Sequence, residues 1–329
     1  MRESREMLQS NRLPENKEII AEHEAEVRQA VNEAKRDPEL EQILAKVDWG
    51  WLKQRFGRIL AHTDIDPASL NFVPPDMIES DHTWESEGFY SIFNNQLVVN
   101  PEKVREVQEL WQVPIELMWL YLLAHEETHA VSKSECVGAF GDVSEYYLRS
   151  GYSLYHANEQ DESKEFDTYQ ILDEGITDKL AREIVLEYLE AHPDFADATG
   201  TKEFTSKLND DRWHKKYNLE VSLVELMIDR LARETGVTSK IVWNAMLQGK
   251  LEGEDLTHQD FQELARQFFS EKFLHQLKMT EASSDKPLGA LSLFKEFNLT
   301  SIDPALKAKI EARIQAAQHL QEEKLSLAA

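Results

Sequence analysis

Two histidines and a glutamate at a fixed spacing are the residues of this chain best suited to chemistry. His125, Glu126 and His129 form the pattern H-E-x-x-H. Residues four apart on a helix leave the same face about one turn apart, so both imidazoles can reach one cation. Glu126 then lies roughly a quarter-turn away, where its carboxylate can hold a water molecule that the metal polarises. The spacing predicts a metal centre with a general base beside it.

The segment that carries this pattern is predicted to be a deeply buried helix. Every residue from Ile115 to Ala124 is apolar except Glu116, and Pro114 suits a first helical turn. Polar groups that are buried without partners cost roughly several kcal/mol each. A metal ion would satisfy the two histidines, and we favour this interpretation over a pair of hydrogen-bonded core histidines.

A catalytic zinc normally takes three protein ligands, so a third ligand must come from elsewhere in the chain. A helix is predicted over residues 172–189, and Glu174 and Asp178 fall on the face that is otherwise apolar. We expect Glu174 to be the third ligand. Asp178, one turn later, is expected to accept the free ring N–H of a ligand histidine. The alternative is that both carboxylates are ordinary charges on a solvated helical turn.

Other residues could supply the third ligand. Glu135 follows His129 by six residues, the position of the third ligand in another group of zinc proteases. That arrangement needs the helix to end sharply, usually at a glycine, and this chain has Ser132 there. Glu174 is therefore favoured over Glu135. His156 and His214 are lesser candidates.

The elements around these residues are predicted to be mostly helical. Helices are expected over residues 1–62, 101–110, 219–235, 238–249, 258–278 and from 303 onwards, and the histidine helix is expected to continue to about residue 134. Strand pairs are expected around Asn94-Asn95 and around residues 149–151, with a loop over 158–165. A strand pair beside the histidine helix could hold an extended peptide as a further strand. The C-terminal helices are expected to pack within the chain.

Composition excludes several classes of partner. The chain has 329 residues, of which 41% are hydrophobic, and 36 basic against 61 acidic residues give a net charge of −25. This charge disfavours nucleic acids and anionic membrane surfaces. Cys136 is the only cysteine, so an internal disulfide and a cysteine zinc cluster are excluded. The N-terminus lacks a signal-peptide core and no apolar run reaches spanning length, so we expect a soluble, cytoplasmic protein of undetermined oligomeric state.

The two motifs together resemble the gluzincin group of zinc metallopeptidases, which are thermolysin-like in their site. The pattern of that group is H-E-x-x-H followed by N-E-x-x-S-D or E-G-x-T-[DE]. Here His125-Glu-Glu-Thr-His129 is followed by Asp173-Glu-Gly-Ile-Thr-Asp178, and the resemblance covers about residues 88–235. Asp173 and Thr177 stand where the thermolysin form has Asn and Ser.

The resemblance implies a fold and a set of roles. The fold would be mainly α (α+β), with a zincin-like catalytic core over residues 76–236 and helical regions over 1–75 and 237–329. A small mixed or antiparallel sheet would lie beside the buried active-site helix. The resemblance implies that His125, His129 and Glu174 bind zinc, that Glu126 is the general base and that Asp178 orients a ligand histidine.

The resemblance also implies a tyrosine or histidine that donates a hydrogen bond to the tetrahedral intermediate. Tyr217 is the first expectation, His214 the second, and Tyr155 and Tyr169 follow. The expected function is zinc-dependent hydrolysis of peptide bonds in a peptide or protein substrate. The alternatives are a non-catalytic zinc protein with an occluded cleft and a zinc hydrolase that acts on a non-peptide ester or amide.

Overall fold

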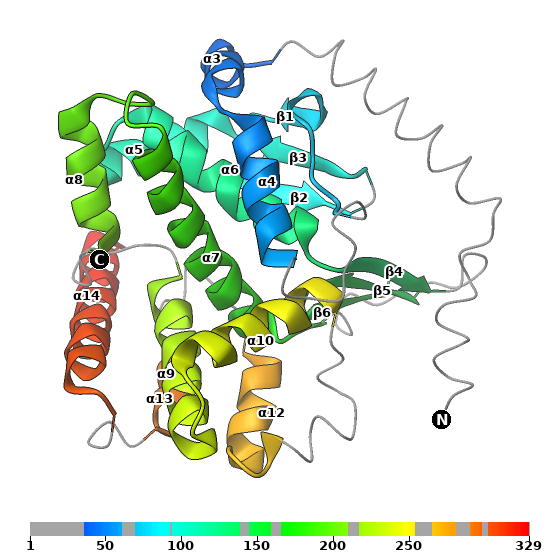
Figure 1. Cartoon of the computed structure of the whole chain (residues 1–329), viewed down its shortest axis with the longest axis vertical. Coiled ribbons are helices and arrows are strands. Elements are labelled where there is room, and N and C mark those ends of the chain that lie inside the picture. The colour runs from blue at the N-terminus through cyan, green and yellow to red at the C-terminus, as the bar shows by residue number, and fades with distance from the viewer. Residues whose placement is uncertain are drawn as a thin grey trace.

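The protein is mainly helical, with two small sheets (Figure 1). The computed structural model describes residues 36–60, 70–92, 94–138, 145–158, 166–209, 217–253, 265–280, 290–297 and 302–328. Within these ranges the expected mainly α architecture with small sheets is confirmed. Every helix in the described ranges is too short or too polar to cross a membrane.

The helices follow the order expected from the sequence, with several additions. Their bounds are α3 (Pro38–Lys46), α4 (Trp49–Leu60), α5 (Pro101–Trp111), α6 (Ile115–Val131), α7 (Gln170–Ala191), α8 (Ala198–Asn209), α9 (Asn218–Thr235), α10 (Ser239–Glu252), α12 (Glu271–Met279), α13 (Leu291–Phe294) and α14 (Pro304–Ala328), with a short 3-10 helix, η2 (Pro75–Met77). Helices α8 and α13 were not predicted. The prediction for residues 1–35 lies outside the described residues.

Helix α6 is the centre of the fold, as its apolar sequence predicts. It is buried along nearly its whole length and packs against α5, α7 and strand β2 (Gly88–Ser91). Its end differs from the prediction, because the helix stops at Val131 and Ser132 is extended. Backbone hydrogen bonds explain this end: Lys133 N donates to Lys250 O, and Lys133 O accepts from Gly151 N at 2.8 Å. The chain after Val131 therefore joins a sheet.

The first sheet lies beside α6 and has the strand order β1-β3-β2. Strand β1 (Ile78–Ser80) is parallel to β3 (Gln96–Val99), and β2 (Gly88–Ser91) is antiparallel to β3. The predicted strand pair is thus confirmed, with a four-residue connection in which Asn95 has φ 48°. Among the described strands, β2 pairs only with β3.

The second sheet is antiparallel in the order β4-β5-β6-β7. Strands β5 (Glu145–Ser150) and β6 (Ser153–Asn158) confirm the second predicted pair, joined by a two-residue turn in which Gly151 has φ 56°. Strands β4 (Ser134–Gly138) and β7 (Phe166–Thr168) flank that pair and were not predicted. Asn158 belongs to β6 rather than to the predicted loop, and residues 159–165 lie outside the described ranges.

The terminal helices share one hydrophobic core with the centre of the chain. That core runs from Leu40 in α3 to Ile310 in α14. Helix α14 packs against α9, where Glu225 pairs with Lys309 and Arg313 at 2.8 Å each. The predicted domain boundaries at residues 75 and 236 stay predictions.

The helix predicted over residues 258–278 is not continuous in its described part. Residues 266–268 form a turn, and α12 begins at Glu271. Ser270 Oγ accepts from Phe273 N at 3.1 Å and so caps the new helix. Because the capping Ser270 begins a new helix, the chain before it is free to leave the helical conformation in the turn at residues 266–268.

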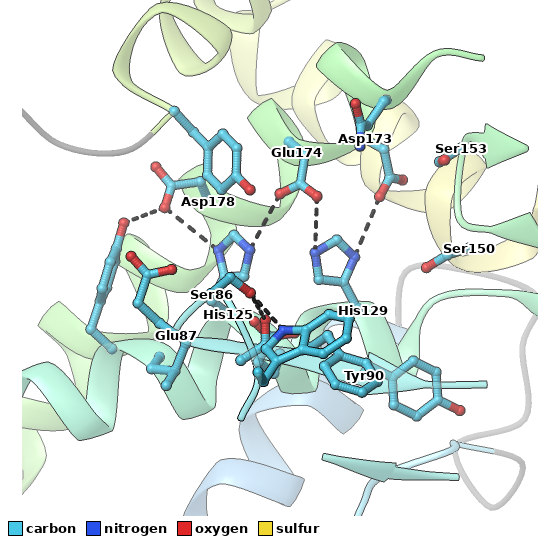
Figure 2. Close-up of a pocket in the computed structure, with 18 of the residues that line it drawn as sticks. Ser86, Glu87, Tyr90, His125, His129, Ser150, Ser153, Asp173, Glu174 and Asp178 are labelled. Carbon is cyan, nitrogen blue, oxygen red and sulfur yellow. Dashed lines mark hydrogen bonds and ion pairs between the residues drawn. The ribbon is translucent and has the colours of Figure 1, made fainter. Parts of the chain in front are cut away.

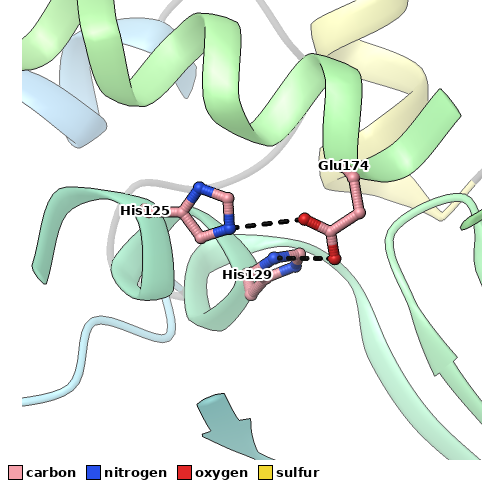
Figure 3. A group of neighbouring side chains, drawn as sticks. All are labelled: His125, His129 and Glu174. Atoms are coloured by element: carbon pink, nitrogen blue, oxygen red, sulfur yellow. Dashed lines mark ion pairs between the residues drawn. The ribbon is translucent and has the colours of Figure 1, made fainter. Parts of the chain in front are cut away.

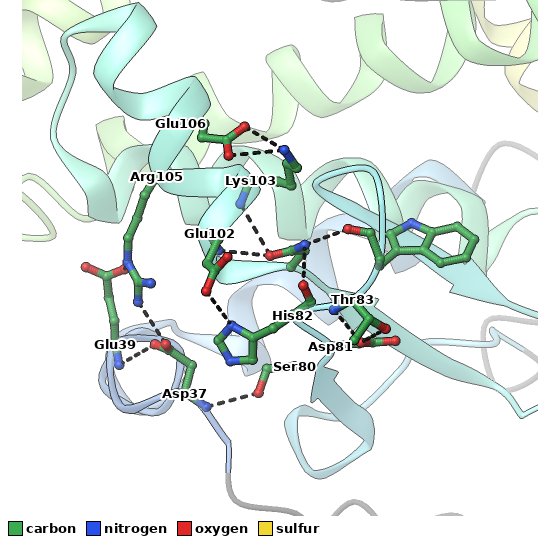
Figure 4. Close-up of polar contacts among 12 residues, drawn as sticks. Asp37, Glu39, Ser80, Asp81, His82, Thr83, Glu102, Lys103, Arg105 and Glu106 are labelled. Carbon is green, nitrogen blue, oxygen red and sulfur yellow. Dashed lines mark hydrogen bonds and ion pairs between the residues drawn. The ribbon is translucent and has the colours of Figure 1, made fainter.

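A polar network fastens α3, α5 and the first sheet to one another (Figure 4). Arg105 Nη2 donates to Asp37 Oδ2 at 2.8 Å, and Asp37 N donates to Ser80 Oγ at 3.0 Å. Asn100 caps α5 and donates to the carbonyl of Trp84 at 2.6 Å. These bonds hold the segment before β2 in place, and Trp84 of this segment lines the cavity described below.

Candidate metal centre

Three side chains from two buried helices converge on one point (Figure 3). His125 and His129 come from the last turns of α6, and Glu174 comes from the first turn and a half of α7. His125 Nε2 lies 3.3 Å from Glu174 Oε2, and His129 Nε2 lies 3.6 Å from Glu174 Oε1. One potential ligand atom from each residue lies within 4.8 Å of the others. These three residues could hold a metal ion, and we call them the metal group.

The chemistry of this donor set fits a cation. Two imidazole nitrogens and a carboxylate oxygen suit a divalent transition metal. Glu174 Oε2 is buried and forms no hydrogen bond of acceptable geometry with the described residues. An ion between the three side chains would satisfy this oxygen.

The charges of the group are mutually stabilised. Burial lowers the pKa of His125, but its interactions with Asp178 and Glu174 outweigh burial and raise the pKa to about 10. Burial raises the pKa of Glu174, but His129 and His125 outweigh it and hold the pKa well below 4.5. Glu174 is therefore ionised and available as a ligand. Metal binding must displace protons from the histidines, so metal affinity falls as the pH falls.

Asp178 lies behind His125, where the sequence placed a partner for a ligand histidine. Its Oδ1 lies 3.6 Å from His125 Nδ1 and accepts a hydrogen bond from the hydroxyl of Tyr121. Arg182 Nη2 lies 2.5 Å from Asp178 Oδ2. These contacts orient the His125 ring with its Nε2 toward Glu174.

Asp173 is the corresponding partner of His129, a role that the sequence reasoning missed. Its Oδ2 lies 3.4 Å from His129 Nδ1, and its Oδ1 accepts from Lys250 Nζ at 2.5 Å and from Tyr152 N at 2.9 Å. The departure from Asn at position 173 was visible in the sequence. Lys250, which compensates the added charge, lies 77 residues away and carried no local signal.

The two consecutive glutamates in the histidine motif have different surroundings. Glu126 lines the cavity with His125 and His129. Glu127 is fully buried elsewhere, and its Oε2 accepts from Val73 N at 3.2 Å. Burial raises the pKa of Glu127 well above 4.5. Only Glu126 is placed to act on a bound molecule.

Of the three alternative ligands, His156 is the one whose side chain the structure describes, and it is not part of the group. The backbone of Glu135 lies in β4 opposite Arg149, and its side chain lies outside the described residues. His156 lies in β6, with its ring 4.6 Å from that of Tyr147. His214 lies outside the described residues.

Tyr217, the first expectation for the oxyanion donor, lies at the metal group. Its ring stacks on His125 with a centroid distance of 5.6 Å and an interplanar angle of 10°. Burial, followed by the charge of Glu174, raises the pKa of Tyr217 well above 10, so its hydroxyl is a neutral donor. Tyr155 also lines the cavity, whereas Tyr169 is buried at the start of α7.

A close backbone contact brings Tyr217 to this position. Helices α7 and α9 meet at Gly175, where an added Cβ would lie 2.6 Å from the carbonyl oxygen of Glu220. Tyr217 precedes α9 and has φ 61°, a left-handed conformation that turns the chain into the helix. The glycine of the second motif thus allows the approach that places the tyrosine beside His125.

The metal group opens into a cavity of about 790 Å³ (Figure 2). Its walls come from β2, α5, α6, α7, the strands β5 to β7 and Tyr217. The site therefore combines three metal donors, a carboxylate that is not among them, a neutral phenol and space for a ligand. In comparisons with models of protein families, with curated proteins and with solved structures, nothing matched this chain.

Proposed function

We propose that this protein is a zinc-dependent peptidase of the gluzincin type. The observation that carries the proposal is the convergence of His125, His129 and Glu174 beside Glu126 in one cavity. Two histidines and a glutamate are the protein ligands of one class of catalytic zinc site, which keeps a further position open. Zinc is therefore the proposed metal. A purely structural zinc site has no use for a carboxylate beside an open position, so we propose a catalytic site.

Each residue of the site has a distinct role in the proposed reaction. Zinc bound to this group would lower the pKa of a water molecule and polarise a substrate carbonyl. Glu126 accepts the proton of that water and delivers it to the leaving amine. Asp178 and Asp173 hold the two imidazoles in orientation. Tyr217 donates its hydroxyl proton in a hydrogen bond to the oxygen that becomes negatively charged.

The outer edge of β2 supports a peptide as the substrate. Gly88, Phe89 and Tyr90 of this strand line the cavity, and β2 has a partner on only one side among the described strands. An extended peptide can pair with such an edge through its backbone, whatever its side chains. A small ester or amide gains nothing from this edge.

We propose the cytoplasm as the compartment, since a single cysteine permits no internal disulfide.

Zinc content and cleavage of an unbiased peptide library test the proposal. Wild type and Glu126→Gln are expected to bind one zinc per chain, and only wild type should cleave peptides. Glu127→Gln is the matched control, because Glu127 lies on the same helix, does not line the cavity and has Val73 as its partner. It should keep both zinc and activity.

Two outcomes would contradict the proposal. Near-wild-type turnover by Glu126→Gln would mean that any hydrolysis uses another site. Full zinc occupancy without cleavage of any peptide by wild type would identify a zinc-binding protein that is not a peptidase.

A further inference from the structure

The two ends of the cavity differ in chemistry. The wall formed by α5 and α6 is apolar and is lined by Val104, Val107, Trp111, Met118 and Leu122. Glu87, from the segment before β2, adds a carboxylate on the same side of the cavity (Figure 2). The Trp111 ring lies 5.8 Å from that of Tyr121, which bonds to the Asp178 partner of His125. The apolar wall is therefore on the His125 side of the metal group.

The opposite end is polar and lies on the His129 side. Ser150, Ser153 and Asp167 line it. Figure 2 shows Ser150 and Ser153 beyond His129 and Asp173, away from Asp178. Strands β6 and β7 place Asp167 here, because it lies opposite Tyr155 in the sheet, and Ser153 Oγ donates to its Oδ1 at 2.6 Å.

Asp167 forms no ion pair with the residues that the structure describes, and it accepts a hydrogen bond from Ser153 Oγ. Burial, together with the charges of Asp173 and Glu174, raises the pKa of Asp167 to about 6, although the hydrogen bond from Ser153 lowers it. The carboxylate is still mostly ionised at pH 7. A half-buried carboxylate of this kind is stabilised by a cation that enters the cavity.

A second observation points to a ligand at the same end. Ser150 Oγ is buried there and forms no hydrogen bond with the described residues. Buried hydroxyls normally have a partner. A hydrogen-bonding group from a bound molecule would provide one for Ser150 as well as for Asp167.

We propose that the cavity selects peptides that place a bulky apolar side chain between α5 and α6 and a cationic group at Asp167. The inference rests on the proposed peptidase function and names its substrate class. The cation is a lysine or arginine side chain or the N-terminal ammonium of the substrate, because each offers N–H donors and a positive charge to one carboxylate. The net charge of −25 favours the approach of such peptides.

Internally quenched peptides test this selection with zinc-loaded protein. The set contrasts Phe with Ala for the apolar position, Lys with norleucine for the cationic position, and free with acetylated N-termini. Wild type is expected to cleave the cationic, Phe-containing peptides at least about tenfold more efficiently in kcat/KM than the uncharged ones. Asp167→Asn should lose the preference for the cation and keep the preference for Phe over Ala. That retained preference also shows that the variant is folded.

Asp194→Asn is the matched control. Asp194 is exposed in the loop after α7, and its replacement removes the same charge as Asp167→Asn. It should behave as wild type. If norleucine removes the preference, the cation is a side chain, and if acetylation removes it, the cation is the N-terminal ammonium. Either result supports the proposal. An unchanged cation preference in Asp167→Asn, or no such preference in wild type, would overturn it.

Binding separates this inference from the proposed reaction. Fluorescence polarisation of the same peptides, labelled with a dye, measures affinity in Glu126→Gln and in Glu126→Gln combined with Asp167→Asn. Weaker binding of cationic peptides by the double variant, by about tenfold or more, supports the cation site even if wild type hydrolyses nothing. Hydrolysis by wild type without any charge preference would refute the cation site and leave the peptidase proposal standing.

Discussion

Replacement of Lys250 by methionine tests the buried ion pair behind the metal group. Lys250 and Asp173 are each 1% exposed, and Nζ lies 2.5 Å from Oδ1. Methionine keeps most of the length of the side chain but removes the charge and the donor, which leaves the Asp173 carboxylate with His129 and Tyr152 N as partners. Breaking a buried pair from one side costs about 3–5 kcal/mol. We expect Lys250→Met to reduce the free energy of unfolding by about this amount.

A second substitution separates the uncompensated charge from the loss of packing. In Lys250→Met combined with Asp173→Asn the carboxylate that lost its lysine is removed as well, and the Asn oxygen can still accept from Tyr152 N. The double variant should therefore be more stable than Lys250→Met, with a coupling of about 1–3 kcal/mol between the two positions. Urea unfolding of the metal-free protein, followed by tryptophan fluorescence, measures both values.

The control is Lys103→Met, which removes a lysine that pairs with Glu106 on the exposed face of α5. It should leave the urea midpoint unchanged. A loss below about 1 kcal/mol in Lys250→Met, or additive effects in the double variant, would refute the view that Lys250 compensates a buried charge.

Four further substitutions probe the site and its supports. Asp178→Asn should weaken zinc binding by roughly ten- to a hundredfold, because it alters the partner of His125, and unchanged affinity in a competition titration would contradict this role. Tyr217→Phe should lower kcat by roughly a hundredfold with little change in KM, and wild-type kcat would exclude the hydroxyl as the oxyanion donor. Gly175→Ala should cost about 1–3 kcal/mol in urea unfolding, since its methyl group would meet the Glu220 carbonyl, and full stability would show that the helices can separate. Burial raises the pKa of Glu220 from 4.5 to about 7, so the folded state retains a proton and loses stability as the pH rises from about 4.5 to about 7. Glu220→Gln should therefore gain up to about 3 kcal/mol at pH 8 and nothing near pH 4.5, and a gain that does not vary with pH would contradict the assignment.

The parts of the site that the sequence predicts depend on local geometry. His125 and His129 are four apart on one helix, as are Glu174 and Asp178, so helical periodicity alone aligns each pair. The nearly unbroken apolar run before His125 predicts the burial of α6, and the structure shows that burial. Turn-forming residues likewise predict the strand pairs β2–β3 and β5–β6.

The parts that the sequence does not predict depend on contacts between distant segments. Lys250 reaches Asp173 only because α10 packs against α7 and the turn at Gly151. Short strands such as β4 and β7 exist because β5 and β6 offer them edges, and three to five residues carry little pattern of their own. The prediction for the end of α6 was wrong for the same reason, since the carbonyl of Lys250 and the amide of Gly151 hold Lys133 just before β4 begins.

The acidic partners of the two histidines are each paired with a buried cation, and this pairing fixes the formal charge of the centre. The four carboxylates of Glu126, Asp173, Glu174 and Asp178, set against Arg182 and Lys250, leave two negative charges when the histidines are neutral. A divalent ion would bring that value to zero. Without the two cations the same centre would keep two negative charges even with the ion bound, in a protein whose net charge is already −25. In the proposed reaction Arg182 and Lys250 would thus reduce the repulsion that a carbonyl oxygen meets at the centre of an acidic protein.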